Sequence, residues 1–72
     1  MNQIDLHGMT HDEALLKAED FVLLQSQDMV FQCRIITGNS NRLSKKIIEM
    51  LESHNFNWYI PSWNLGEIIV TH

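Results

Sequence analysis

Along the chain, short segments typical of β-strands alternate with longer segments whose apolar residues have helical spacing, and this alternation most constrains the fold. Short segments rich in β-forming residues predict strands at 4–7, 30–37, 57–61 and 67–71. Between them, apolar residues recur at helical spacing over 10–27 and 41–53. Each predicted helix connects one strand to the next, and such strand–helix–strand units favour parallel strands joined by right-handed crossovers.

The side chains of the first two predicted strands alternate between two faces, which indicates how many layers the fold has. The set expected to face the helices consists of Ile4, Leu6, Cys33 and Ile35. The set expected to point the other way consists of Asp5, His7, Gln32 and Arg34. Two crossovers of the same hand place both helices on one face. The sequence therefore predicts a two-layer α/β (α+β) sandwich with a four-stranded sheet, ordered βαβαββ, whose other face is open.

The length and the cysteine content bound the class of protein. The 72 residues fit a single domain spanning 1–72, near the lower size limit for folding without disulfides or metals. Cys33 is the only cysteine, so no internal disulfide can form, which is typical of a reducing compartment. Residues 1–8 do not resemble a secretory signal, and no apolar run is long enough to span a bilayer. These features predict a cytoplasmic protein with no membrane partner.

The charge balance limits how the chain can bind nucleic acid. The formal net charge is −4, and this acidic balance argues against tight nonspecific DNA binding. Three basic residues nevertheless cluster at the start of the second predicted helix: Arg42, Lys45 and Lys46. They either contact phosphates as a local patch or form an ordinary solvated helix face.

Asp5 and His7 are the residues best suited to carry chemistry. They lie two apart at the carboxyl end of the first predicted strand, so their side chains share one face beside Gly8 and a helix start. A histidine exchanges protons near neutral pH, and a carboxylate can orient it or hold a divalent ion such as Mg²⁺. The alternative is structural: Asp5 caps the backbone or pairs locally, for example with Arg34, and His7 is a surface residue.

A polar turn at 37–41 follows the second predicted strand in the equivalent position. If the two strands are parallel neighbours, this turn and Gly8 meet at one edge of the sheet, together with two helix N-termini. Helix N-termini favour phosphates, because their first N–H groups have no partner within the helix. The edge therefore suits phosphodiester cleavage or phosphate binding.

The segment Ile4-Asp5-Leu6-His7-Gly8, followed by Met9-Thr10 and Glu13-Ala14, resembles the opening of the Smr domain. This family is named for small MutS-related proteins, and its glycine-rich turn corresponds here to Thr37-Gly38-Asn39-Ser40. The resemblance covers essentially the whole chain and implies a mixed sheet in which only the last strand is antiparallel. It also implies nicking or endonuclease activity on DNA or RNA, with Asp5 and His7 as the catalytic pair.

The resemblance further implies that Gly8, Thr37, Gly38 and Asn39 shape a phosphate-facing edge next to that pair. With the adjoining Ser40 and Asn41 and the basic cluster, the candidate nucleic-acid-binding residues are Gly8, Thr37, Gly38, Asn39, Ser40, Asn41, Arg42, Lys45 and Lys46. Ser40 stands where the family has a glycine, and a Cβ there hinders close approach of a phosphate. Two functions stay open: a nuclease that uses Asp5 and His7, with or without a divalent metal, and a non-catalytic adaptor that binds RNA or protein.

Three aromatic residues, Trp58, Tyr59 and Trp63, cluster around the third predicted strand. One interpretation is stacking on single-stranded bases. The favoured interpretation is packing in the core and the hairpin of a small domain. The apolar stripe of the second helix is expected to extend to His54, and Cys33 is expected to lie in the core.

Overall fold

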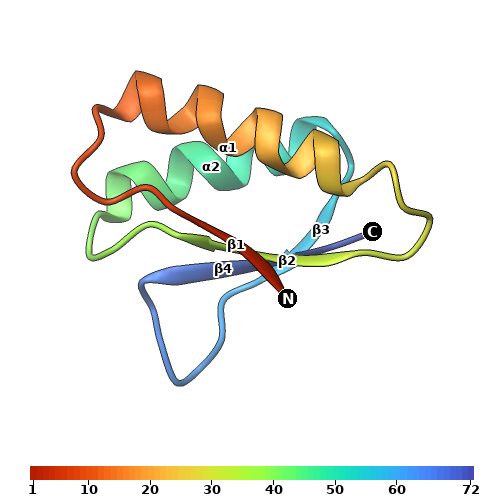
Figure 1. Ribbon diagram of the computed structural model, residues 1–72. Coiled ribbons are helices and arrows are strands. Elements are labelled where there is room, and N and C mark those ends of the chain that lie inside the picture. Colours follow the sequence, from red (N-terminus) through yellow and green to blue (C-terminus); the bar gives the residue numbers. More distant parts are fainter.

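The computed structural model describes all 72 residues, and its elements follow the predicted order βαβαββ (Figure 1). The elements are β1 (Asn2–Asp5), α1 (His11–Gln25), β2 (Gln32–Ile36), α2 (Asn41–Ser53), β3 (Asn57–Tyr59) and β4 (Glu67–Thr71). The second helix and the last strand have the predicted bounds. Neither helix has the length and apolar character that crossing a membrane requires.

The first strand begins and ends earlier than predicted. Its parallel ladder with β2 ends where Asp5 pairs with Ile36. One more backbone bond follows, from the amide of Leu6 to the carbonyl of Ile36 at 2.9 Å. His7 therefore lies beyond the strand, at the beginning of the turn that leads to α1.

The four strands form one mixed sheet in the order β1-β2-β4-β3. β1 and β2 are parallel, whereas β4 is antiparallel to both of its neighbours. The expectation that only the last strand is antiparallel is confirmed. The crossover through α2 leaves room for one strand between β2 and β3, and β4 folds back into that place.

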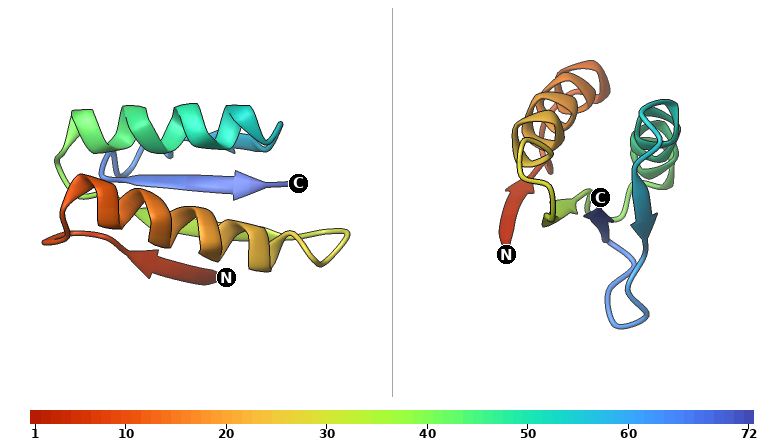
Figure 2. Two further views of the ribbon diagram at one scale, coloured as in Figure 1. Left: turned by 90° about the horizontal axis from the view of Figure 1, so that it is seen from above. Right: turned by 90° about the vertical axis from the view of Figure 1, so that its right-hand side faces the viewer.

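Both helices cover the same face of the sheet, as the end-on view in Figure 2 shows. The core between the two layers consists of Leu6, Ala14, Ala18, Val22, Phe31, Cys33, Ile35, Leu43, Ile47, Met50, Leu51, Ile68 and Val70. Ile4 is half-buried against this core, so the predicted inward set is confirmed. His54 is not part of the α2 stripe: it is exposed and its Nε2 lies 2.8 Å from Glu19 Oε2.

The face opposite the helices is less open than predicted. The connection between β3 and β4 extends below the sheet on that side (Figures 1 and 2). Ile69 and Glu67 of β4 are buried although they point to this face, and Pro61 of the connection is buried as well. The open surface is therefore concentrated over β1 and β2.

Ile68 tests the central position of β4, because its side chain is fully buried in the core. Replacement by alanine is expected to lower the free energy of unfolding by about 2–5 kcal/mol, and replacement by valine by about 0.5–1.5 kcal/mol. Urea denaturation measures both changes. The exposed Leu65 is the matched control, since its replacement by alanine should change the value by less than about 0.5 kcal/mol. Equal losses at both positions would contradict the placement of β4.

Candidate functional site

Asp5 and His7 form a hydrogen-bonded pair at the end of β1. The Nδ1 atom of His7 lies 2.7 Å from Asp5 Oδ1, and the backbone N–H of His7 donates to the same oxygen at 3.1 Å. Because an ionised carboxylate only accepts hydrogen bonds, Nδ1 carries the proton in this pair. The imidazole is thus fixed with its Nε2 atom available, and most of the His7 side chain is exposed.

The pair also changes the electrostatics of the carboxylate. The side-chain hydrogen bond from His7 lowers the pKa of Asp5 below its ordinary value of 3.8, and the backbone N–H of His7 lowers it further. Both bonds are made to the charged form of the carboxylate, which favours that form. Asp5 is therefore an anion throughout the neutral pH range.

The turns after β1 and β2 meet at one edge of the sheet, as predicted (Figure 1). Gly8 and Gly38 have φ angles of 82° and 69°, a region that disfavours residues with a side chain. A Cβ built on Gly38 would lie 3.8 Å from the Cβ of His7. The second turn thus packs directly beside the histidine.

The N-termini of both helices lie at this same edge. Thr10 caps α1 by accepting a bond from the amide of Glu13 at 3.2 Å, and Ser40 caps α2 by accepting one from Leu43 at 3.1 Å. His11, the first residue of α1, brings the two ends together, since its Nε2 lies 3.5 Å from Ser40 Oγ. The sequence prediction missed His11, although its place directly after the Thr10 cap was a usable signal.

Part of the predicted phosphate-binding edge is available. Gly8 and Asn39 are exposed, and Ser40 is half-buried. The backbone N–H groups of these three residues donate to no acceptor in the chain. Ser40 has φ −89° in extended backbone, so the position does not require glycine, and its hydroxyl serves as the α2 cap. Asn41 is exposed and is the first residue of α2.

Thr37 and Gly38 have a different role from the predicted one. The carbonyl of Gly66, at the start of β4, accepts bonds from the amides of Thr37 at 2.8 Å and Gly38 at 3.0 Å. The Thr37 hydroxyl also donates to this carbonyl at 3.2 Å, and the Thr37 side chain is buried. These donors connect β2 to β4, so they do not face a ligand.

The basic residues fall into two groups. Arg42, Lys45 and Lys46 are exposed on the first two turns of α2 and pair with no carboxylate. Arg34 is instead engaged on the sheet, with its Nε 3.4 Å from Glu67 Oε1 and its Nη1 donating to Gln3 at 3.2 Å. The suggested Asp5–Arg34 pair is therefore wrong.

The donor set near Asp5 does not form a metal site by itself. His, Cys, Asp and Glu side chains form no group of three or more that could share an ion. Mg²⁺ is often held by one or two carboxylates together with substrate phosphates and water. A divalent ion at Asp5 would therefore need most of its ligands from outside the chain.

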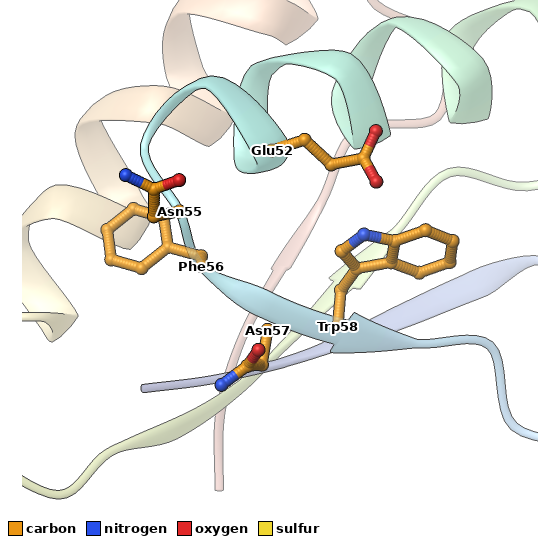
Figure 3. Close-up of a pocket in the computed structure, with 5 residues that line it drawn as sticks. All are labelled: Glu52, Asn55, Phe56, Asn57 and Trp58. Carbon is orange, nitrogen blue, oxygen red and sulfur yellow. The ribbon is translucent and has the colours of Figure 1, made fainter.

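The hollows of the surface lie away from this edge. The larger one, about 400 Å³, lies at the C-terminal end of α2 between Glu52, Asn55, Phe56, Asn57 and Trp58 (Figure 3). The other, about 320 Å³, is lined by Val30, Phe31, Gln32, Thr71 and His72. Neither contains a residue of the Asp5–His7 edge, which is an exposed surface and not a pocket.

The aromatic residues around β3 do not share one role. Trp58 is half-buried and packs against the core, as predicted. Trp63 and Tyr59 are exposed, so the interpretation of these two rings as core packing is wrong. The Cys33 thiol is fully buried, as predicted, and burial raises its pKa to about 11, which makes it unreactive.

Comparison with known proteins gives one match. The family model described as "Smr domain" matches residues 4–63. No curated protein and no solved structure matches the chain. The matched residues include the Asp5–His7 pair and both turns, whereas β4 lies beyond them.

Replacement of His7 by alanine is expected to raise the pKa of Asp5 toward its ordinary value, because the imidazole bond is the largest cause of the lowering. The pKa of Asp5 is not expected to reach its ordinary value, because the backbone N–H of residue 7 still donates a hydrogen bond to the Asp5 carboxylate. An NMR titration of the Asp5 carboxyl carbon measures the change.

The sign of the pH dependence follows from the same shift. The lowered pKa stabilises the fold above the unfolded-state pKa of Asp5, and this contribution fades as the pH falls through the folded-state value. His54→Ala is the matched control and should leave the Asp5 titration unchanged. Identical Asp5 titrations in the wild type and in His7→Ala would show that the pair does not form in solution.

Proposed function

The chain belongs to the Smr domain family, and from this premise we propose that it binds nucleic acid at the Asp5–His7 edge and cleaves phosphodiester bonds there. Smr domains are generally nucleic-acid-binding or nicking domains. The observation that carries the proposal is the oriented imidazole of His7, which lies beside unpaired backbone N–H groups and two helix N-termini.

His7 is the proposed catalytic base. Its Nε2 would accept a proton from the attacking oxygen, either of water or of a ribose 2′-hydroxyl, while that oxygen bonds to phosphorus. The amides of Gly8, Asn39 and Ser40 are free to donate to the phosphate oxygens, on which negative charge accumulates. The leaving oxygen then takes a proton from solvent or from the imidazolium.

Asp5 is the proposed positioning residue. Its carboxylate holds the Nδ1 proton and so presents Nε2 as the base. It also stabilises the imidazolium that forms when His7 accepts a proton. The lowered pKa of Asp5 supports this role, because the carboxylate is charged throughout the neutral range.

A non-catalytic adaptor is the second candidate. The amides of Thr37 and Gly38 are already bonded to Gly66, so the edge offers fewer donors than a complete phosphate cradle. The net charge of −4 also weakens electrostatic attraction to nucleic acid. In this function the domain would bind RNA or a protein without cutting.

For either function we propose a cytoplasmic location, in which the thiol of Cys33 stays reduced.

A cleavage assay separates the two candidates. The wild type is expected to nick supercoiled DNA or cut single-stranded RNA, and Asp5→Ala/His7→Ala to lose about 100- to 10,000-fold in rate, as expected when a general base is removed. Assays with Mg²⁺ and with a chelator determine whether a metal participates. His54→Ala is the control and should keep full activity. Equal product from the wild type and the double variant would refute cleavage by this pair.

A salt titration of binding tests the basic patch. If Arg42, Lys45 and Lys46 each neutralise one phosphate of a single strand, the log–log slope should be about −2 for the wild type. Replacing all three by alanine should bring the slope near zero. Lys17→Ala, on α1, is the control and should leave the slope unchanged. A wild-type slope near zero would mean that these side chains do not contact phosphates.

A further inference from the structure

The connection between β3 and β4 presents a tryptophan to solvent. Trp63 is 74% exposed and Leu65 is 78% exposed, whereas Pro61 of the same segment is fully buried. A large aromatic side chain that is mostly exposed contributes little to the core, so packing does not explain it. The segment is anchored at its base and exposes its apolar side chains near the tip.

The C-terminal end of this segment is bonded to the turn that packs beside His7. Gly66, three residues after Trp63, bonds through its carbonyl to the amide of Gly38, which packs beside His7. Asn64 fixes the base of the segment, because its side chain accepts from the amide of Gly66 at 2.9 Å and donates to Glu67 at 3.3 Å. Three residues of chain span at most about 11 Å, so the backbone of Trp63 lies within about 11 Å of Gly66, which is bonded to that turn.

A second exposed aromatic ring lies on the same face of the sheet. Tyr59 is 44% exposed, and its register opposite Ile69 places it on the face that Asp5 also occupies. Its hydroxyl lies 3.5 Å from Gln32 Nε2, so the side chain reaches across β4 to β2. The connection that carries Trp63 extends below this face (Figures 1 and 2).

The segment that carries these rings contributes no charged side chain. No aspartate, glutamate, lysine or arginine occurs from Ser53 to Gly66, in a chain whose net charge is −4. The next acid, Glu67, is buried and paired with Arg34. A polyanion can therefore approach the aromatic rings more easily than it can approach the acidic surface of α1.

We propose that this face binds single-stranded nucleic acid, with unpaired bases stacked on Trp63 and Tyr59 and the backbone running to His7. The inference rests on the proposed function and specifies its substrate class. Base faces are free for stacking in single strands, whereas in a duplex they are covered by neighbouring base pairs. Stacking requires no particular base, so this face is expected to distinguish single strands from duplexes more strongly than one base sequence from another.

The affinity test compares two neighbouring exposed side chains. In a His7→Ala background, which prevents cleavage by the proposed base, Trp63→Ala should weaken binding of a single-stranded oligonucleotide by about 5- to 150-fold. Leu65→Ala is the matched control, because Leu65 is equally exposed but has no ring, and it should bind as the background does. Trp63→Phe should retain most of the affinity. Parallel measurements with DNA and RNA of one sequence identify which of the two is preferred.

Fluorescence reports the stacking directly. Trp58→Phe leaves Trp63 as the only indole in the chain. A single strand should quench this emission, and the duplex of the same sequence should not. A urea denaturation of each variant confirms that it is folded.

Three results would overturn the inference: unchanged affinity in Trp63→Ala, an equal loss in Leu65→Ala, or equal quenching by duplex and single strand. Cleavage that does not depend on Trp63 would overturn this inference alone. Trp63-dependent binding without any cleavage would leave it standing and refute only the catalytic role of His7. Absence of any nucleic-acid binding would overturn both.

Discussion

The antiparallel ladder between β2 and β4 holds the domain together. Its inward pairs, Cys33 with Val70 and Ile35 with Ile68, form the floor of the core on which both helices pack. The carbonyl of Gly66 extends the ladder by accepting bonds from the two residues that follow β2. A Cβ on Gly66 would lie 3.1 Å from the carbonyl oxygen of Gly38, so glycine allows this close approach.

The candidate site depends on that junction. The turn that follows β2 is fixed by Gly66, and it packs beside His7 at the end of the neighbouring strand. The same junction directs the Trp63 segment below the sheet. One backbone carbonyl thus connects the proposed catalytic edge, the start of α2 and the aromatic face, although these parts are distant in the sequence.

Much of the fold could be predicted because local patterns determine it. Helical spacing, the Thr10 cap and the alternation around Leu6 and Ile35 are properties of short segments. The sequence predicts that Asp5 and His7 lie together on a strand that reaches His7. The strand ends at Asp5 instead, and the two side chains meet in the turn, where the backbone N–H of His7 also donates to Asp5. The family resemblance, now supported by the match over residues 4–63, was carried by these same residues.

The errors concern contacts between distant segments. No local pattern shows that β4 inserts beside β2, so the use of the Thr37 and Gly38 amides by Gly66 was not foreseen. The same insertion buries Glu67 against Arg34 and removes Arg34 as a partner for Asp5. The place of Trp63 beside the third strand favours packing, but the long connection to β4 exposes its side chain.

The most direct measurement of where nucleic acid binds is an NMR titration of the backbone amides with a short single strand that resists cleavage. The largest shifts are expected at Gly8, Asn39 and Ser40, whose N–H groups are free, with further shifts near Trp63. Shifts concentrated at the hollow between Glu52 and Trp58, or no shifts at the Asp5–His7 edge, would contradict the proposed site.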